Sequence, residues 1–295
     1  MRYASAGAFR AALEARLKNE QTDGMSASRL RKRVVFERLL ARLHAVAPEG
    51  WYLKGGFALE LRLGIEARTT KDVDIDWALA EGEATELLLD AAAHHLDDWF
   101  EFDVRRSRAD HDLAGGGQRW TVRAELGGRE FESVAIDVGF GVPPVVEPDS
   151  VSTSRLLQFA DIEAVVVSTA AVEQHLAEKL HAYTRIYAGD QPSSRVKDLV
   201  DVVVIVRTMA VDGDRLLEAM SSIFERRGTH PTPRRLPAPP SDWARPWAVL
   251  VENLPADAEL TAGAAAAVAF WDPVLAGVVA GGAWDPAASA WRSRK

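Results

Sequence analysis

Residues 52–76 constrain this chain more than any other stretch, because they join a double glycine to three closely spaced aspartates. A short apolar run leads into Gly55-Gly56, a helix-like segment follows, and Gly64 stands where a glycine commonly ends a helix. Acidic and β-branched residues then alternate over 72–76, which predicts a strand with two different faces. The stretch therefore predicts the order strand, glycine turn, helix, strand.

The two faces of the predicted acidic strand differ in chemistry. Val73 and Ile75 point towards a core, whereas Asp72, Asp74 and Asp76 line the other face about 7 Å apart. Three such carboxylates repel one another, and in a cleft they need a compensating cation. Oxygen ligands of this kind suit Mg²⁺ or Mn²⁺. The strand therefore predicts a divalent metal site, although an acidic face is also found on strands that only protect a sheet edge.

The double glycine supplies the other half of this candidate site. Glycines at a helix start let backbone N–H groups approach an anion closely, so Gly55 and Gly56 are candidates for holding phosphates. A Gly-Gly pair taken alone is usually only a turn. The combination of glycines and carboxylates in this order favours phosphoryl or nucleotidyl transfer.

The composition is that of an ordinary globular protein. The 295 residues are 47% hydrophobic and 26% charged, which gives enough material for two domains or one large one. The chain has no cysteine, so disulfides and cysteine-ligated zinc or iron–sulfur sites are excluded, and a cytoplasmic location is expected. No apolar run approaches the roughly 20 residues of a membrane span, so no membrane contact is expected.

The net charge of −8 argues against nonspecific coating of nucleic acid, because that affinity comes mostly from Lys and Arg neutralising phosphates. One local exception is the basic run 29–33, which continues to Arg38 and Arg42 on a predicted helix. This run is either a nucleic-acid contact or a solvated helix face.

The rest of the first half predicts helices followed by strands. Residues 1–46 are expected to form two helices and 83–96 a further one, while alternating apolar and polar residues predict strands near 100–104, 120–126 and 130–139.

Asp137 lies among small residues on the last of these predicted strands. If that strand pairs with the acidic strand, Asp137 joins Asp72 and Asp74 in a three-carboxylate cluster of the kind that two-metal chemistry requires. The alternative is that Asp137 caps a turn at the end of the strand.

The second half is expected to be mainly helical, after a proline-marked linker over 142–150. Ser168 or Thr169 can cap a helix, and another helix begins near Ser194. The β-branched run 202–206 in this second helix also suits a buried strand. Tryptophans are expected to pack the alanine-rich helical tail onto the body of the protein: Trp243, Trp247, Trp271, Trp284 and Trp291.

Four blocks of sequence within about residues 30–207 resemble, in their order, those of the AbiEii/AbiGii toxin family, which includes the MenT-type toxins: KGGFALELRLG, RTTKDVDID, AEKLHAY and RVKDLVDV. These toxins are nucleotidyltransferases of the DNA polymerase β-like superfamily. The resemblance implies an α+β (α/β) fold, with a nucleotidyltransferase-like mixed sheet flanked by helices in the N-terminal half and a mainly helical C-terminal half. It implies a nucleotidyltransferase core with N-terminal helices over 1–147 and a helical domain over 148–295 that completes the active-site cleft.

Carried over by position, the resemblance implies four catalytic residues: Asp72, Asp74, Lys179 and Asp198. Asp76 lies outside the acidic pair of the family. The expected metal ligands are Asp72, Asp74 and Asp137, and the expected nucleotide contacts are Gly55, Gly56, Thr70, Lys71 and Lys179. Lys179 suits a point-charge contact to a triphosphate, which Asp198 could orient. Without the resemblance, Lys179 would be a helix lysine reaching for solvent, and Asp198 an acid favoured in the first turn of a helix.

The expected mechanism is an in-line attack on the α-phosphorus of an NTP, supported by Mg²⁺ or Mn²⁺. The family resemblance implies the acceptor, which is the 3′ end of tRNA, where an added nucleotide would block aminoacylation and stop translation. It also implies a type IV-like toxin-antitoxin system with a cognate antitoxin encoded nearby. Two alternatives stay open: transfer to a protein or small molecule, and a catalytically silent module that binds a nucleotide or a partner.

Overall fold

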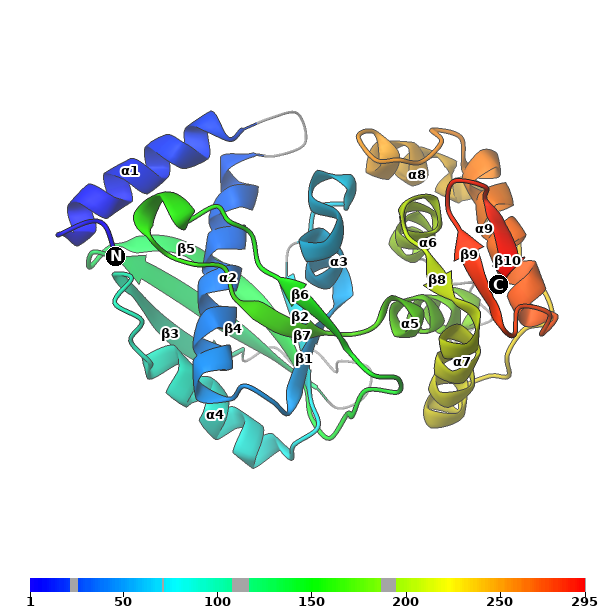
Figure 1. The fold of residues 1–295 in the computed structure, drawn as a ribbon, viewed down its shortest axis with the longest axis horizontal. Helices are drawn as coiled ribbons and strands as arrows, with labels where there is room; N and C mark the ends of the chain where they lie inside the picture. The colour runs from blue at the N-terminus through cyan, green and yellow to red at the C-terminus, as the bar shows by residue number, and fades with distance from the viewer. Residues whose placement is uncertain (22–25, 71, 108–116, 187–194, 295) are drawn as a thin grey trace. The chain divides into compact units, whose positions relative to one another are not determined.

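The structure, a computed structural model, describes residues 1–21, 26–70, 72–107, 117–186 and 195–294 (Figure 1). Two compact units divide the chain. Unit 1 comprises Met1–Ile65, Thr69–Pro144 and Pro148–Ala170, and unit 2 comprises Glu66–Arg68, Val145–Glu147 and Ala171–Lys295.

Unit 1 combines helices with one sheet. Its elements along the chain are α1 (Ala6–Asn19), α2 (Ala27–Val46), β1 (Trp51–Lys54), α3 (Gly55–Leu63), β2 (Asp72–Trp77), α4 (Glu81–Ala93), β3 (Phe100–Arg106), β4 (Gln118–Leu126), β5 (Glu130–Gly139), β6 (Asp149–Ser152), the 3₁₀ turn η2 (Gln158–Ala160) and β7 (Val166–Thr169). A further 3₁₀ turn, η1 (Gly64–Glu66), follows α3.

Within the described residues, seven strands form a mixed sheet in the order β3-β4-β5-β2-β1-β7-β6. The pairs β2–β5 and β1–β7 are parallel, and the other neighbouring pairs are antiparallel. The acidic strand β2 therefore lies in the interior of the sheet, between β5 and β1. This mixed architecture confirms the predicted fold class.

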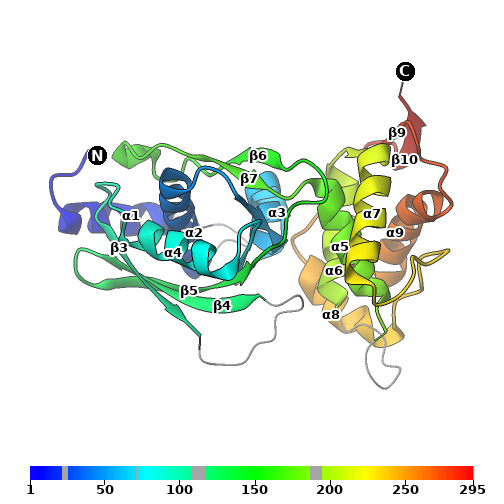
Figure 2. The ribbon, with the colours of Figure 1, turned by 90° about the horizontal axis from the view of Figure 1, so that it is seen from below.

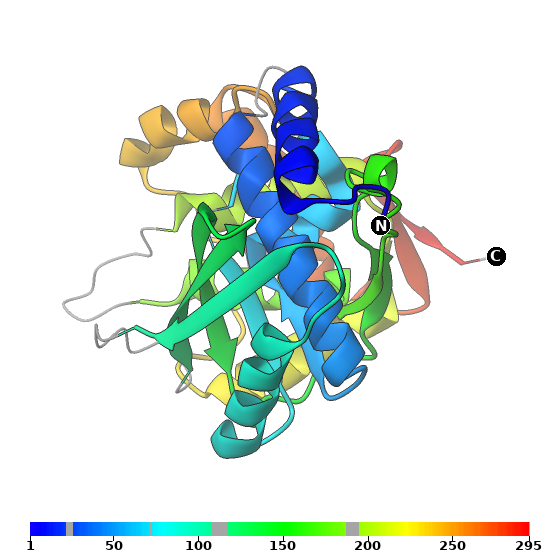
Figure 3. The same ribbon diagram turned by 90° about the vertical axis from the view of Figure 1, so that its left-hand side faces the viewer.

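The alternation seen in the sequence sets the two faces of this sheet. On β5, the side chains of Val134, Ile136 and Val138 are buried, whereas the residues between them are only partly buried or exposed. The buried face joins a core to which α2 contributes Leu39 and Leu43. Figure 2 shows α2 and α4 lying along one face of the sheet, and Figure 3 shows α1 beside the start of α2. The polar face of β2 and β5 is thereby left for chemistry.

Unit 2 is mainly helical. Its elements are α5 (Val172–Thr184), α6 (Val196–Thr208), β8 (Val211–Asp212), α7 (Gly213–Arg227), the 3₁₀ turn η3 (Ser241–Trp243), α8 (Ala244–Val251), α9 (Leu260–Leu275), β9 (Gly282–Asp285) and β10 (Ala290–Ser293). Helix α5 contacts α6 and α7, and α6 contacts α8 and α9. The β-branched run 202–206 is helical and buried, because α6 is covered by three other helices.

Two predictions about the second half are wrong. Ser168 and Thr169 do not cap a helix but end β7, where the fully buried Thr169 donates its hydroxyl to the Asp149 carbonyl. Trp284 and Trp291 lie not in helices but in the hairpin of β9 and β10, with ring centroids 5.8 Å apart. These strands are only four residues long, which is too short for an alternating pattern to stand out.

All five tryptophans pack against the interior of unit 2. The side chains of four of them are buried, namely Trp243, Trp247, Trp271 and Trp284. Trp291 is partly exposed, but its ring lies against Phe270, and its Nε1 donates to the Phe270 carbonyl at 2.9 Å. Across the described residues, no helix has the length and apolar character needed to cross a membrane.

Candidate active site

The turn between β1 and α3 brings the chain directly against the acidic strand. Gly55 has a φ of +68°, a backbone conformation that residues with a Cβ atom rarely adopt. A Cβ built on Gly55 would lie 1.8 Å from Oδ2 of Asp74. Only a glycine therefore fits between the start of α3 and this carboxylate. Gly56 follows, buried in the first turn of α3.

The sheet register brings together the three aspartates that the sequence predicts as metal ligands. Asp72 and Asp74 lie two residues apart on β2, and Asp74 is directly opposite Asp137 of the parallel strand β5. Neighbouring strands lie about 4.8 Å apart, so all three carboxylates share one small region on the polar face of the sheet. The three-carboxylate prediction required that the strand of Asp137 pair with the acidic strand. The structure has this pairing, between β5 and β2.

The electrostatics of this region shift the titration of Asp74. Burial raises the pKa of Asp74 to about 6, opposed by the nearby ammonium of Lys54 and reinforced by the charges of Asp72, Asp137 and Asp76. Burial is the main cause of the raised pKa, and the neighbouring carboxylates add to it. Such a cluster favours any cation that can approach it.

Asp76 is held apart from the other three aspartates. It is 1% exposed, and its Oδ2 accepts hydrogen bonds from Nζ of Lys54 at 2.6 Å and from the Tyr52 hydroxyl at 3.1 Å. A Cβ on Gly139 would lie 2.2 Å from Asp76 Oδ1. Asp76 is therefore enclosed and neutralised by its own partners, which agrees with its place outside the acidic pair.

Arg119 is a member of the site that the sequence did not reveal. It lies on β4 opposite Asp137, and its Nε and Nη2 each donate to the Asp137 carboxylate at 2.6 Å. The same Nη2 also donates to Oδ2 of Asp72 at 3.1 Å. The only sequence signal was an arginine at the start of a predicted strand, and its meaning depends on the register.

The donor set fits a divalent cation in chemistry, because carboxylate oxygens are the ligands that Mg²⁺ and Mn²⁺ prefer. Among the residues that the structure describes, however, no three acidic or histidine side chains converge at metal-binding distance. The guanidinium of Arg119 bridges two of the three carboxylates instead. Asp72, Asp74 and Asp137 are the residues that would hold the cation.

The nucleotide contacts predicted beside Asp72 have separate outcomes. Thr70 is buried, and its hydroxyl donates to the backbone carbonyl of Asp72 at 3.0 Å, so its side chain fixes the start of β2. Lys71 lies outside the described residues.

Lys179 and Asp198 form a buried ionic cluster within unit 2. Nζ of Lys179, on α5, lies 2.5 Å from Asp201 Oδ2 and 3.3 Å from Asp198 Oδ1, both on α6. Arg68 contacts the same Asp201 through two nitrogens, at 2.7 and 2.9 Å. Burial opposes the charge on Lys179, but Asp201 and Asp198 raise its pKa above the ordinary value. Sequence reasoning missed Arg68 and Asp201, because their pairing joins distant segments.

The sequence suggested that the basic run on α2 is either a nucleic-acid contact or a solvated helix face. The structure shows neither, because the arginines of the run are paired internally. Its arginines pair with carboxylates inside unit 1, in the pairs Arg29–Glu60, Arg31–Glu14, Arg33–Glu37, Arg38–Asp98 and Arg42–Asp98. Arg42 is only 1% exposed. These side chains bind α2 to its surroundings and are not a solvated face.

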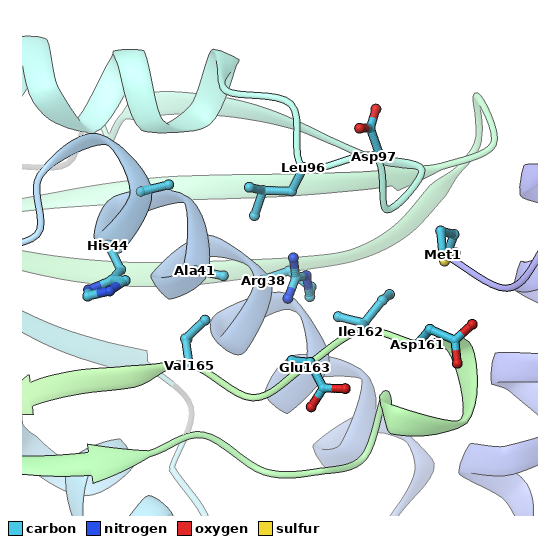
Figure 4. A pocket seen from close by; sticks show the side chains of 11 residues that line it. Met1, Arg38, Ala41, His44, Leu96, Asp97, Asp161, Ile162, Glu163 and Val165 are labelled. Atoms are coloured by element: carbon cyan, nitrogen blue, oxygen red, sulfur yellow. The ribbon is translucent and has the colours of Figure 1, made fainter.

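A cavity of about 470 Å³ lies elsewhere in unit 1 (Figure 4). Its lining includes Arg38, His44, Asp97 and Glu163, which come from α2 and from the segments after α4 and before β7. None of the predicted site residues lines it. The cavity mixes both signs of charge, so it does not single out one class of ligand.

A family model of known proteins covers most of the chain. Residues 38–271 match the family model described as nucleotidyl transferase AbiEii toxin, type IV TA system. No curated protein sequence matches the chain.

The solved structures that match this chain include the following three. MenT4, a nucleotidyltransferase toxin from Mycobacterium tuberculosis H37Rv, is 20% identical, with 76% of this chain and 75% of that chain covered and a TM-score of 0.53. JHP933 from Helicobacter pylori is 17% identical, with 83% and 94% covered and a TM-score of 0.47. A putative nucleotidyltransferase from H. pylori is 16% identical, with 84% and 95% covered and a TM-score of 0.47.

Proposed function

The chain belongs to the AbiEii family of nucleotidyltransferase toxins of type IV toxin-antitoxin systems, and from this premise we propose that it transfers a nucleotide from an NTP to the 3′ end of tRNA. The added nucleotide would block aminoacylation and so stop translation in the cytoplasm. The family also implies an antitoxin that restrains the enzyme.

One observation carries this proposal, which is the register of β2 and β5. It sets Asp74 opposite Asp137 and places Asp72 on the same face, while the Gly55 turn lies against Asp74. A helix start beside a carboxylate cluster suits a nucleoside triphosphate, because backbone N–H groups hold phosphate and carboxylates hold its cation.

The residues have distinct roles in the proposed reaction. Gly55 and Gly56 admit the triphosphate to the start of α3, since no side chain stands between the backbone and Asp74. Asp72, Asp74 and Asp137 would hold Mg²⁺ or Mn²⁺ through their carboxylate oxygens. A divalent cation bound there would supply charge stabilisation for the attacking oxygen and the departing pyrophosphate.

The helical half has a supporting role in this proposal. We propose that unit 1, with β6 and β7 in its sheet, forms the nucleotidyltransferase core, and that in unit 2 Lys179 contacts the triphosphate and Asp198 orients Lys179. The hydrogen bond between these two side chains supports the orienting role. Thr70 and Lys71 remain predicted nucleotide contacts.

The proposal is tested by incubating the purified chain with Mg²⁺, each labelled NTP in turn, and either total tRNA or a cell lysate. Label on tRNA, lost in an Asp74→Asn protein purified in the same way, is the expected result. The Asp74→Asn arm excludes a contaminating tRNA transferase.

Other outcomes of the same assay discriminate the alternatives. Label on a protein or small molecule would replace tRNA as the acceptor but keep the chemistry. No label from any NTP, with a folded protein, would contradict nucleotidyl transfer by this site.

A further inference from the structure

The positively charged side chain of Arg119 is bound to two of the predicted metal ligands, Asp72 and Asp137. Its guanidinium makes two parallel contacts of 2.6 Å with Asp137 and a third contact, at 3.1 Å, with Asp72. Two parallel N–H···O bonds give the strong, planar pairing that arginine forms with carboxylates. Arg119 therefore interacts with the oxygens that the cation of the proposed reaction would need.

Among the described residues, Lys54 also lies near the cluster, but it pairs with a different carboxylate. Nζ of Lys54 lies 2.6 Å from Oδ2 of Asp76. Of the four aspartates, Asp76 thus pairs with Lys54, whereas Asp72 and Asp137 pair with Arg119. The pairing by Arg119 is the one that overlaps with the proposed metal ligands.

The contact between Arg119 and Asp72 is open to solvent. The side chain of Arg119 is 29% exposed and that of Asp72 is 37% exposed, whereas that of Asp137 is 13% exposed. Partly exposed ion pairs are weak enough to be exchanged for a better cation. The hydrogen bond to Asp137 and the surrounding carboxylates raise the pKa of Arg119, so the guanidinium stays charged at any working pH.

We propose that Arg119 is an internal counter-cation that competes with the divalent metal for Asp72 and Asp137 and thereby sets the metal affinity of the enzyme. This inference rests on the proposed function, because it takes the metal to bind these carboxylates. Arg119 is a positioning residue in this account. It holds the two carboxylates in place, and metal binding has to displace it from them.

The test is a titration of the purified full-length chain with Mn²⁺, in which free Mn²⁺ is measured by electron paramagnetic resonance. Removing the competing charge in Arg119→Gln is expected to lower the dissociation constant for Mn²⁺ about tenfold, the size of effect typical for one charged contact. Nucleotidyl transfer by the same variant, if retained, is expected to reach half its maximum at a lower Mg²⁺ concentration.

Arg123→Gln is the matched control. Arg123 lies on the same strand β4, but its partners are Glu125 and Glu130, away from the aspartates. The dissociation constant of the Arg123→Gln protein for Mn²⁺ is expected to equal that of the unchanged chain. If Arg119→Gln fails to fold, Arg119→Lys keeps the charge but loses the two-pronged contact, and a smaller tightening is expected.

The outcomes separate this inference from the proposed function. Equal or weaker Mn²⁺ binding by the folded Arg119 variants, with the unchanged chain binding Mn²⁺, would overturn the competition while leaving the metal site intact. No Mn²⁺ binding by any of the proteins, with or without an NTP, would overturn the metal site and the inference together.

Discussion

At the scale of single residues, the absence of one side chain at Gly55 decides the geometry of the acidic site. The turn needs a positive φ, and Asp74 Oδ2 occupies the space that a Cβ would fill. Sequence reasoning found this glycine because the conformational freedom of glycine is a local property. It could not find Arg119, whose role depends on the pairing of β4 with β5, which sets Arg119 opposite Asp137.

Gly55→Ala is expected to lower nucleotidyl transfer at least about 100-fold, because the new methyl group must displace the Asp74 carboxylate from its position. The unfolding free energy should fall by about 1–3 kcal/mol, owing to the strained φ and the clash. Initial rates and urea melts measure the two effects.

Gly82→Ala is the matched control, because Gly82 lies in α4 and a Cβ there would meet no atom within 4 Å. It should keep full activity and gain up to about 1 kcal/mol of stability. Equal activity in the two alanine variants would contradict the close approach of Gly55 to Asp74.

At the scale of elements, apolar residues that recur every two or every 3.6 positions predicted most of the long strands and helices. The strands β2 and β5 were predicted from alternation, and their parallel pairing then created the site. The short strands β6 and β7 were missed, since their pairing is long-range and leaves little pattern in four residues. The ionic contacts between α5 and α6 were also out of reach, because a helix sequence does not reveal its partner.

Asp201→Asn should destabilise the protein by about 3 kcal/mol at neutral pH, because it leaves the buried charges of Lys179 and Arg68 with one carboxylate fewer. Urea melts against Asp242→Asn, a change at an exposed aspartate, provide the comparison. The Asp242 variant should stay within about 0.5 kcal/mol of the unchanged chain.

The pH dependence of this difference follows from the direction of the Asp201 shift. Burial opposes its charge, but Lys179 and Arg68 lower its pKa in the folded state. Its contribution to stability is therefore full above the ordinary aspartate pKa of about 3.9 and disappears as the pH falls through the lowered value. A difference between the unchanged chain and Asp201→Asn that grew on acidification would contradict the buried cluster.

At the scale of the whole molecule, the arginine-rich run of α2 stabilises the fold through internal ion pairs. The chain carries a net charge of −8, and the arginines of α2 are paired with internal carboxylates. Sequence alone could not show this, since an arginine-rich helix looks the same whether its partners are phosphates or buried acids. The acidic face of β2 and β5 differs among the described residues, because one guanidinium, that of Arg119, is shared by two of its carboxylates.

Anomalous X-ray diffraction from crystals grown with Mn²⁺ and a non-hydrolysable NTP locates the metal without depending on activity. We expect a manganese peak against the carboxylates of Asp72, Asp74 and Asp137, with the triphosphate next to the Gly55 turn and Arg119 turned away from Asp72 and Asp137. A manganese peak at any other site, with Asp72 and Asp137 still bound to Arg119, would contradict the proposed metal site.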